Sequence, residues 1–101
     1  MTAYMVLTHM VHDAAAFRRD YIPAIRPVLR KHDIEVIAIS LGASPLEGTA
    51  NSAVVFRAAS EAVFHQFYND PEFEEPKQIR HSMTSDRTMV VIPALEEPTA
   101  E

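Results

Sequence analysis

Four segments of the chain are predicted to be β-strands, in which successive residues point to opposite faces of a sheet. The first segment, residues 4–11, divides into Tyr4, Val6, Thr8 and Met10 on one side and Met5, Leu7, His9 and Val11 on the other. Both sets are mainly apolar, which is typical of a strand buried on both faces. Further strands are predicted over residues 34–41, 52–57 and 87–93, which are rich in β-branched residues.

A helical pattern follows the first strand. Asp13 stands at an N-cap position, and apolar residues then recur at three- and four-residue steps from Phe17 to Leu29. Pro23 and Pro27 lie inside this stretch. Proline lacks a backbone N–H and clashes with the carbonyl four residues earlier. We therefore expect the helix to kink or split close to Pro23, which also suits the first residue of a second helical piece.

The second half of the chain repeats the order of strand and helix. A loop over residues 42–51 contains both glycines of the chain and leads into the strand at 52–57. A second helix is predicted from Ser60, as N-cap, to the Asn69-Asp70-Pro71 turn. Residues 72–83 are predicted to form a short helical segment broken by Pro76, before the last strand.

The resulting order, β-α-β-β-α-β, predicts an α+β fold of the ferredoxin-like class: a four-stranded antiparallel sheet with both helices on one face. Two helices cover only one face of such a sheet, yet every strand carries apolar residues on both faces. We therefore expect an identical sheet from a second copy to cover the open face in a homodimer. An interface of standard stable size hides about 800 Å² per chain.

Composition and charge limit the number of domains, the kinds of partner and the expected location of the protein. The 101 residues suit one domain, predicted over residues 1–95, followed by an acidic, mobile tail over residues 96–101. A net charge of −5 disfavours nucleic acid as a partner. The absence of cysteine makes the reducing cytoplasm the expected location. No apolar run is long enough to span a membrane, and no signal peptide is recognisable.

Several short motifs, in order over roughly residues 3–94, resemble a known family, the domain of unknown function 1330 of the dimeric α+β barrel superfamily. They are the strand after Met-x-Ala-Tyr, Tyr21 to Pro27, Lys31-His32, Leu46-Glu47-Gly48, Val54-Val55-Phe56, Ala62, Phe67-Tyr68, Asp70-Pro71-Glu72-Phe73 and Arg80. The resemblance implies a ferredoxin-like protomer and a homodimer, and it implies no assigned reaction.

The sequence departs from the family pattern in two places. His32-Asp33-Ile34 replaces the usual Tyr-Gly-Gly after the first helix, so we expect Asp33 to adopt the left-handed conformation there. Thr49-Ala50-Asn51 stands where the family has a proline after Glu-Gly, which affects the shape of a pocket near this loop.

Glu47 and Arg80 are the catalytic candidates. Glu47 lies in the long loop, and Arg80 lies in the helical segment that runs near the open end of the sheet. A buried carboxylate serves as a general base, and an arginine fork holds a substrate carboxylate. The alternative is a salt bridge between the two residues that fixes the loop to the helix.

Ligand-binding candidates are Tyr21, His9, Tyr68 and Phe67. The two phenols lie on apolar helix faces, where each is either a donor in a cleft between helices and sheet or a core aromatic with a wet hydroxyl. His9 and His12, three residues apart on a strand, point to opposite faces, so no metal site is predicted. No cofactor motif occurs: there is no Gly-x-Gly-x-x-Gly, no Walker pattern and no Gly-x-Ser-x-Gly.

The sequence therefore predicts a small homodimer with a pocket between helices and sheet for a small, largely apolar molecule that carries a carboxylate or carbonyl. By analogy of fold alone, its reaction would be that of a cofactor-independent oxygenase or isomerase. The alternatives are a non-catalytic ligand-binding module and a purely structural dimer.

Overall fold

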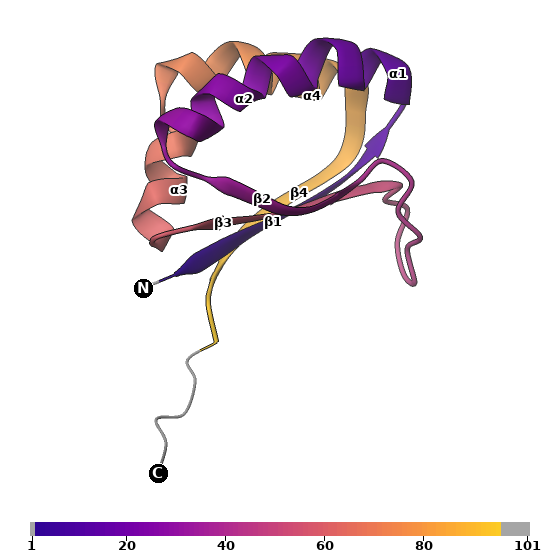
Figure 1. The fold of residues 1–101 in the computed structure, drawn as a ribbon. Coiled ribbons are helices and arrows are strands. Elements are labelled where there is room, and N and C mark those ends of the chain that lie inside the picture. The colour runs from indigo at the N-terminus through magenta and orange to yellow at the C-terminus, as the bar shows by residue number, and fades with distance from the viewer. Residues whose placement is uncertain (1, 96–101) are drawn as a thin grey trace.

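The computed structural model describes residues 2–95; the predicted acidic tail, residues 96–101, lies outside the described residues. Four antiparallel strands form one sheet in the order β2-β3-β1-β4, and the helices all lie on one of its faces (Figure 1). The elements are β1 (Ala3–Val11), α1 (Ala14–Ala16), η1 (Phe17–Tyr21), α2 (Ile22–Lys31), β2 (Glu35–Ser40), β3 (Ser52–Ala58), α3 (Glu61–Tyr68), η2 (Pro71–Phe73), α4 (Glu74–Met83) and β4 (Thr84–Pro93). This is the predicted ferredoxin-like, α+β arrangement.

The covered face of the sheet holds the core. Odd-numbered residues of β1 are buried along the whole strand, and on β3 the buried residues include Val54 and Phe56. The helices contribute aromatic rings to the same core, with Phe64, Phe67 and Phe73 almost completely buried. The hydrophobic effect of this burial is the main stabilising contribution to the fold.

The long first helix changes its winding before Pro23. Asp13 caps it as predicted, accepting from Ala16 N at 3.1 Å. Residues Phe17–Tyr21 then form a π-helical turn, in which Ile22 N donates to Phe17 O. Pro23 occupies the start of α2, where its missing N–H costs least. The predicted irregularity near Pro23 is thus a π-turn that changes which side chains of η1 and α2 face the sheet.

Two predicted details of the second half were wrong. Pro76 does not break the segment 72–83, because it lies in the first turn of α4, where backbone N–H groups have no partner within the helix. Ser60 stands at the N-cap position of α3, but its side chain makes no capping hydrogen bond. The prediction for Asp33 is confirmed, since its φ is 55°.

The other face of the sheet is not covered by helices (Figure 1) and carries an apolar row. The register places Val55, Val6 and Val90 side by side across β3, β1 and β4. Val90 is 52% exposed and Ile92, on the same face of β4, is 46% exposed. The helices cover the opposite face only (Figure 1). An apolar row of this kind is the surface that the sequence predicts to need covering.

None of the helices within residues 2–95 is both long and apolar enough to cross a membrane.

A buried carboxylate joins the end of α2 to the turn after α3. Asp70 accepts from His32 Nε2 at 2.7 Å, from Lys31 Nζ at 2.9 Å and from Glu72 N at 2.9 Å. These donors hold the pKa of Asp70 well below its usual range, the backbone N–H of Glu72 contributing most. The two halves of the helical layer are therefore connected by one ionised group.

We expect Asp70→Asn to lower the free energy of unfolding at pH 7, measured by urea denaturation, more than the control Glu72→Gln. The control removes a more distant and exposed carboxylate, 3.5 Å from Lys31 Nζ. Because the folded pKa of Asp70 is depressed, its stabilisation is present above the unfolded value near 4 and is lost as the pH falls through the folded value. The difference between wild type and Asp70→Asn should therefore shrink in acid. Equal effects of the two variants at pH 7 would contradict this assignment.

Candidate functional site

An apolar cleft lies between the long helix and one half of the sheet. It has a volume of about 250 Å³. Helical residues on one side and residues of β1, β2 and β3 on the other form its walls. These residues are Phe17, Tyr21, Ile22, Ile25, Arg26 and Leu29, and Leu7, His9, Val36, Ile39, Val54 and Phe56. An apolar cavity of about 150 Å³ already accepts benzene, so this cleft is large enough for a substituted aromatic ring.

A bulge in β2 forms the open side of this cleft. Val36 pairs with Phe56 and Ile39 pairs with Val54, although three positions separate Val36 from Ile39 and only two separate their partners. The extra residue lets both side chains lie on the helix side of the sheet. They remain 42% and 53% exposed, since β2 is an edge strand at the margin of the helical layer. The cleft therefore opens along this edge.

His9 is the main polar residue of the cleft wall. It is fully buried and lies edge-on to Phe17. Arg80 Nε donates to His9 Nδ1 at 3.2 Å, and His9 Nε2 lies 3.2 Å from Ser52 Oγ. Because Nδ1 accepts a hydrogen bond, the proton of the neutral ring must be on Nε2 and points to Ser52. The imidazole is thus held in one tautomer by residues from α4 and β3.

Electrostatics keep this imidazole neutral. Burial, followed by the positive charges of Arg80 and Arg87, lowers the pKa of His9 to about 4. At neutral pH the ring has no free lone pair, because Arg80 already donates to its only acceptor nitrogen. His9 therefore contributes a fixed polar group to the wall of the cleft and is not a free general base.

Tyr21 lies beside His9 on the wall of the cleft and is 7% exposed. Burial raises the pKa of its hydroxyl to about 12, so the phenol remains protonated and can donate a hydrogen bond. Its ring packs against Phe17, with ring centres 4.7 Å apart.

The other two aromatic candidates lie elsewhere. Phe67 is 2% exposed and packs in the core against Phe73. Tyr68 is 43% exposed on α3, and Lys77 Nζ lies 4.7 Å from the centre of its ring. Tyr68 borders a second hollow between α3 and β4, and neither ring lines the cleft. Of the four ligand-binding candidates, the structure brings together His9 and Tyr21.

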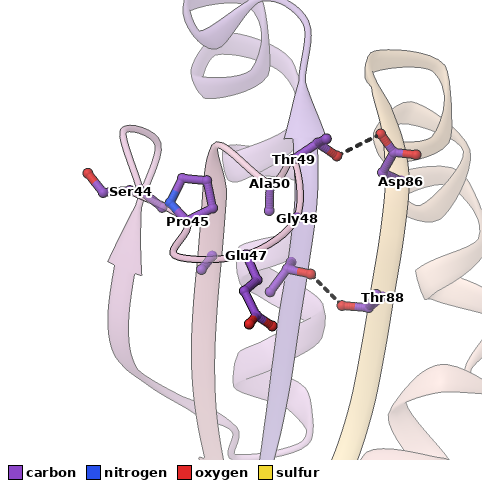
Figure 2. A pocket seen from close by; sticks show the side chains of 11 residues that line it. Ser44, Pro45, Glu47, Gly48, Thr49, Ala50, Asp86 and Thr88 are labelled. Atoms are coloured by element: carbon purple, nitrogen blue, oxygen red, sulfur yellow. Dashed lines mark hydrogen bonds between the residues drawn. The ribbon is translucent and has the colours of Figure 1, made fainter.

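The structure separates Glu47 from Arg80. Arg80 is buried beneath the helical layer, whereas Glu47 lies on the loop that passes over the other side of the strands (Figure 2). Glu47 lines a recess of about 390 Å³ together with Thr8, Thr88 and Asp86. No ion pair between Glu47 and Arg80 occurs within residues 2–95. The loop is instead fixed by Thr49, whose hydroxyl donates to Asp86 at 3.1 Å (Figure 2).

Sequence reasoning missed Ser52 and Arg26. Ser52 is fully buried because it lies on the inward side of β3 with Val54 and Phe56. The sequence could have indicated it as a polar residue on an otherwise apolar face of a strand. Arg26 lies at the rim of the cleft, where no periodic pattern distinguishes it from other exposed arginines of the helix.

These features define a ferredoxin-like α+β protein with an apolar cleft under its long helix. The chain belongs to the family described as Domain of unknown function (DUF1330), which matches residues 2–95. None of the curated proteins compared with the chain matches it.

Solved structures show the same fold at low sequence identity. RPA0582 of Rhodopseudomonas palustris, a protein of unknown function, has a TM-score of 0.76 at 16% identity, over 95% of this chain and 84% of its own. A dimeric, ferredoxin-like protein of unknown function from Bacteroides fragilis has a TM-score of 0.67 at 16% identity, over 92% and 96%. SnoaB of Streptomyces nogalater, a cofactor-independent oxygenase, has a TM-score of 0.70 at 10% identity, over 98% of both chains.

The low pKa of His9 predicts a pH dependence of stability. Between pH 6.5 and about 4 the unfolded chain takes up a proton on residue 9 that the folded chain does not bind. The free energy of unfolding should therefore fall in this window as the pH falls, by roughly 3 kcal/mol from His9. Urea denaturation at a series of pH values should show this slope in wild type and its loss in His9→Gln.

The control for this measurement is His12→Gln, which changes an exposed histidine three residues further along the chain. This variant should keep the slope of wild type. An unchanged slope in His9→Gln would contradict the assignment of a neutral, buried imidazole.

Proposed function

We propose that this protein is a homodimer that binds a small, largely apolar molecule in the cleft between the long helix and the sheet. The observation that carries the proposal is the cleft itself, an apolar hollow of about 250 Å³ with His9 and Tyr21 on its wall and Arg26 at its rim. Concave, mostly apolar sites with few fixed polar groups are typical of small-molecule binding. The exposed Val36 and Ile39 at its mouth give a ligand a route of entry.

The homodimer is proposed on the open face of the sheet. The row Val55, Val6 and Val90 carries no polar group, and the structure leaves Val90 about half exposed. A second copy supplies an identical apolar row, and self-complementary contact of this kind produces a two-fold dimer. The description of the Bacteroides fragilis structure as dimeric supports this proposal.

A cofactor-independent oxygenase or isomerase is the second candidate, and the likeness of fold to SnoaB supports the oxygenase alone. Such chemistry requires a group that removes a proton from the bound molecule. His9 has its acceptor nitrogen occupied by Arg80, and Tyr21 is protonated at neutral pH. Glu47 lines a different recess. These three observations favour binding over catalysis by a base in the cleft.

The cleft is tested with toluene as an apolar probe, added to the full chain and followed by chemical shifts of backbone amides. Shifts should concentrate on residues of the cleft wall, such as Leu7, Ile25 and Ile39. Ile39→Trp places a large ring at the exposed mouth and should weaken toluene binding at least about tenfold, or 1.4 kcal/mol.

Gln66→Trp is the matched control, because it adds the same side chain at an exposed position on α3 that lines none of the described pockets. Glu47→Gln is a second control that tests the recess on the open face. Both variants should bind toluene like wild type. Shifts spread evenly over the surface, or binding unaffected by Ile39→Trp, would contradict the proposed site.

The dimer is tested by sedimentation of wild type and Val90→Asp at micromolar concentration. Wild type should sediment with the mass of two chains. Val90→Asp should sediment as a folded single chain, because a carboxylate buried in the apolar row costs several kcal/mol. Gln66→Asp introduces the same charge on α3 and should remain a dimer. A wild-type protein with the mass of one chain would overturn the proposed assembly.

A further inference from the structure

Arg80 is a buried cation without a counter-ion. Its side chain belongs to α4, and the residue is 3% exposed. Nε donates to His9, but Nη2 is buried and has no hydrogen-bond partner among residues 2–95. No carboxylate of this part of the chain forms an ion pair with Arg80. Burial lowers the pKa of Arg80, yet a guanidinium remains protonated in proteins.

A second positive charge further destabilises the buried guanidinium of Arg80. Arg87 adds a second positive charge, and its Nη1 is already engaged with Thr84 O at 2.6 Å. The other groups that influence Arg80 are the hydroxyls of Tyr21 and Tyr68. A buried charge that lacks a partner is strongly destabilising. Within residues 2–95, Arg80 thus has a neutral acceptor in His9 and a second positive charge nearby, but no ion pair with a carboxylate.

Arg80 adjoins the cleft through two of its wall residues. His9 accepts its Nε–H, and α4 packs on η1, which carries Tyr21. Both residues line the cleft. Arg80 itself is not among the lining residues, so its guanidinium lies behind this part of the wall. An acceptor that passes between His9 and Tyr21 would reach two donors, the unpartnered Nη2 of Arg80 and the Tyr21 hydroxyl.

We propose that Arg80 binds the carboxylate of the molecule whose apolar part fills the cleft, and that Tyr21 donates a second hydrogen bond to it. The proposal rests on the proposed binding function and names the class of ligand: a small apolar, preferably aromatic, carboxylic acid. A carboxylate suits the site because the planar fork of arginine matches its two oxygens. It also supplies the negative charge that the described chain does not place beside Arg80.

The test compares phenylacetate with phenylacetamide, two probes of nearly equal shape that differ in charge. Calorimetric titration of the full chain at pH 7 should give at least about tenfold tighter binding of phenylacetate, since only the carboxylate adds charge–charge attraction and two acceptor oxygens for the guanidinium fork. The Nε–H signal of Arg80 in the NMR spectrum should shift on addition of phenylacetate and much less on addition of phenylacetamide.

Arg80→Met should remove the preference for phenylacetate, because the loss of the guanidinium weakens the binding of the carboxylate more than that of the neutral amide. Methionine has a similar length and removes a buried charge that has no counter-ion among the described residues, and it leaves His9 Nδ1 without its donor. Arg80→Lys keeps the charge but loses the fork, so it should retain only part of the preference. If Arg80→Met does not fold, the comparison of the two probes on wild type and the Arg80 signal decide the question alone.

Equal affinity of wild type for the two probes would overturn the role of Arg80 and leave the apolar cleft standing as a binding site. A preference that persists in Arg80→Met would assign the carboxylate to another cation, such as Arg26 at the rim. Binding of toluene without binding of either phenylacetate or phenylacetamide also contradicts this proposal. If no probe binds, both the proposed function and the ligand class fail.

Discussion

The helices leave one face of the sheet and the edge strand β2 uncovered. Both the proposed dimer and the proposed ligand site depend on this incomplete cover. All helices lie on one face of the sheet (Figure 1). The row Val55, Val6 and Val90 lies on the other face, with Val90 about half exposed. On the covered face the layer ends before the edge strand β2, which leaves Ile39 exposed at the mouth of a cleft. We propose that a second copy of the chain covers the first gap and that a small molecule binds in the second.

Polar groups inside the covered face give this cleft its chemical character. His9 connects β1 to Ser52 on β3 and to Arg80 on α4, so its imidazole is fixed in both position and tautomer. This arrangement removes the lone pair that base catalysis needs, and it leaves the guanidinium of Arg80 without an anion. Because of the hydrogen bond between Arg80 and His9, we favour ligand binding over proton transfer at this site. Because the guanidinium lacks an anion, we propose that the ligand is acidic.

The pattern of apolar residues was sufficient to predict the fold, because strands and helices have different periods and their order permits few topologies. It could not place Glu47 and Arg80 relative to each other. Their separation depends on which face of the sheet the 42–51 loop crosses, and this path is set by tertiary contacts such as that between Thr49 and Asp86. The bulge that turns both Val36 and Ile39 toward the helices was equally invisible, since each residue alone fits a regular strand.

A crystal structure of the full chain grown with toluene tests the central claim most directly, because it shows what covers each uncovered part of the sheet. The account predicts a second copy packed on the row Val55, Val6 and Val90, and toluene between α2 and β2. It would be contradicted by a single chain whose valine row faces solvent, with side chains of α2 closing the cleft against Ile39 and leaving no space for the ring.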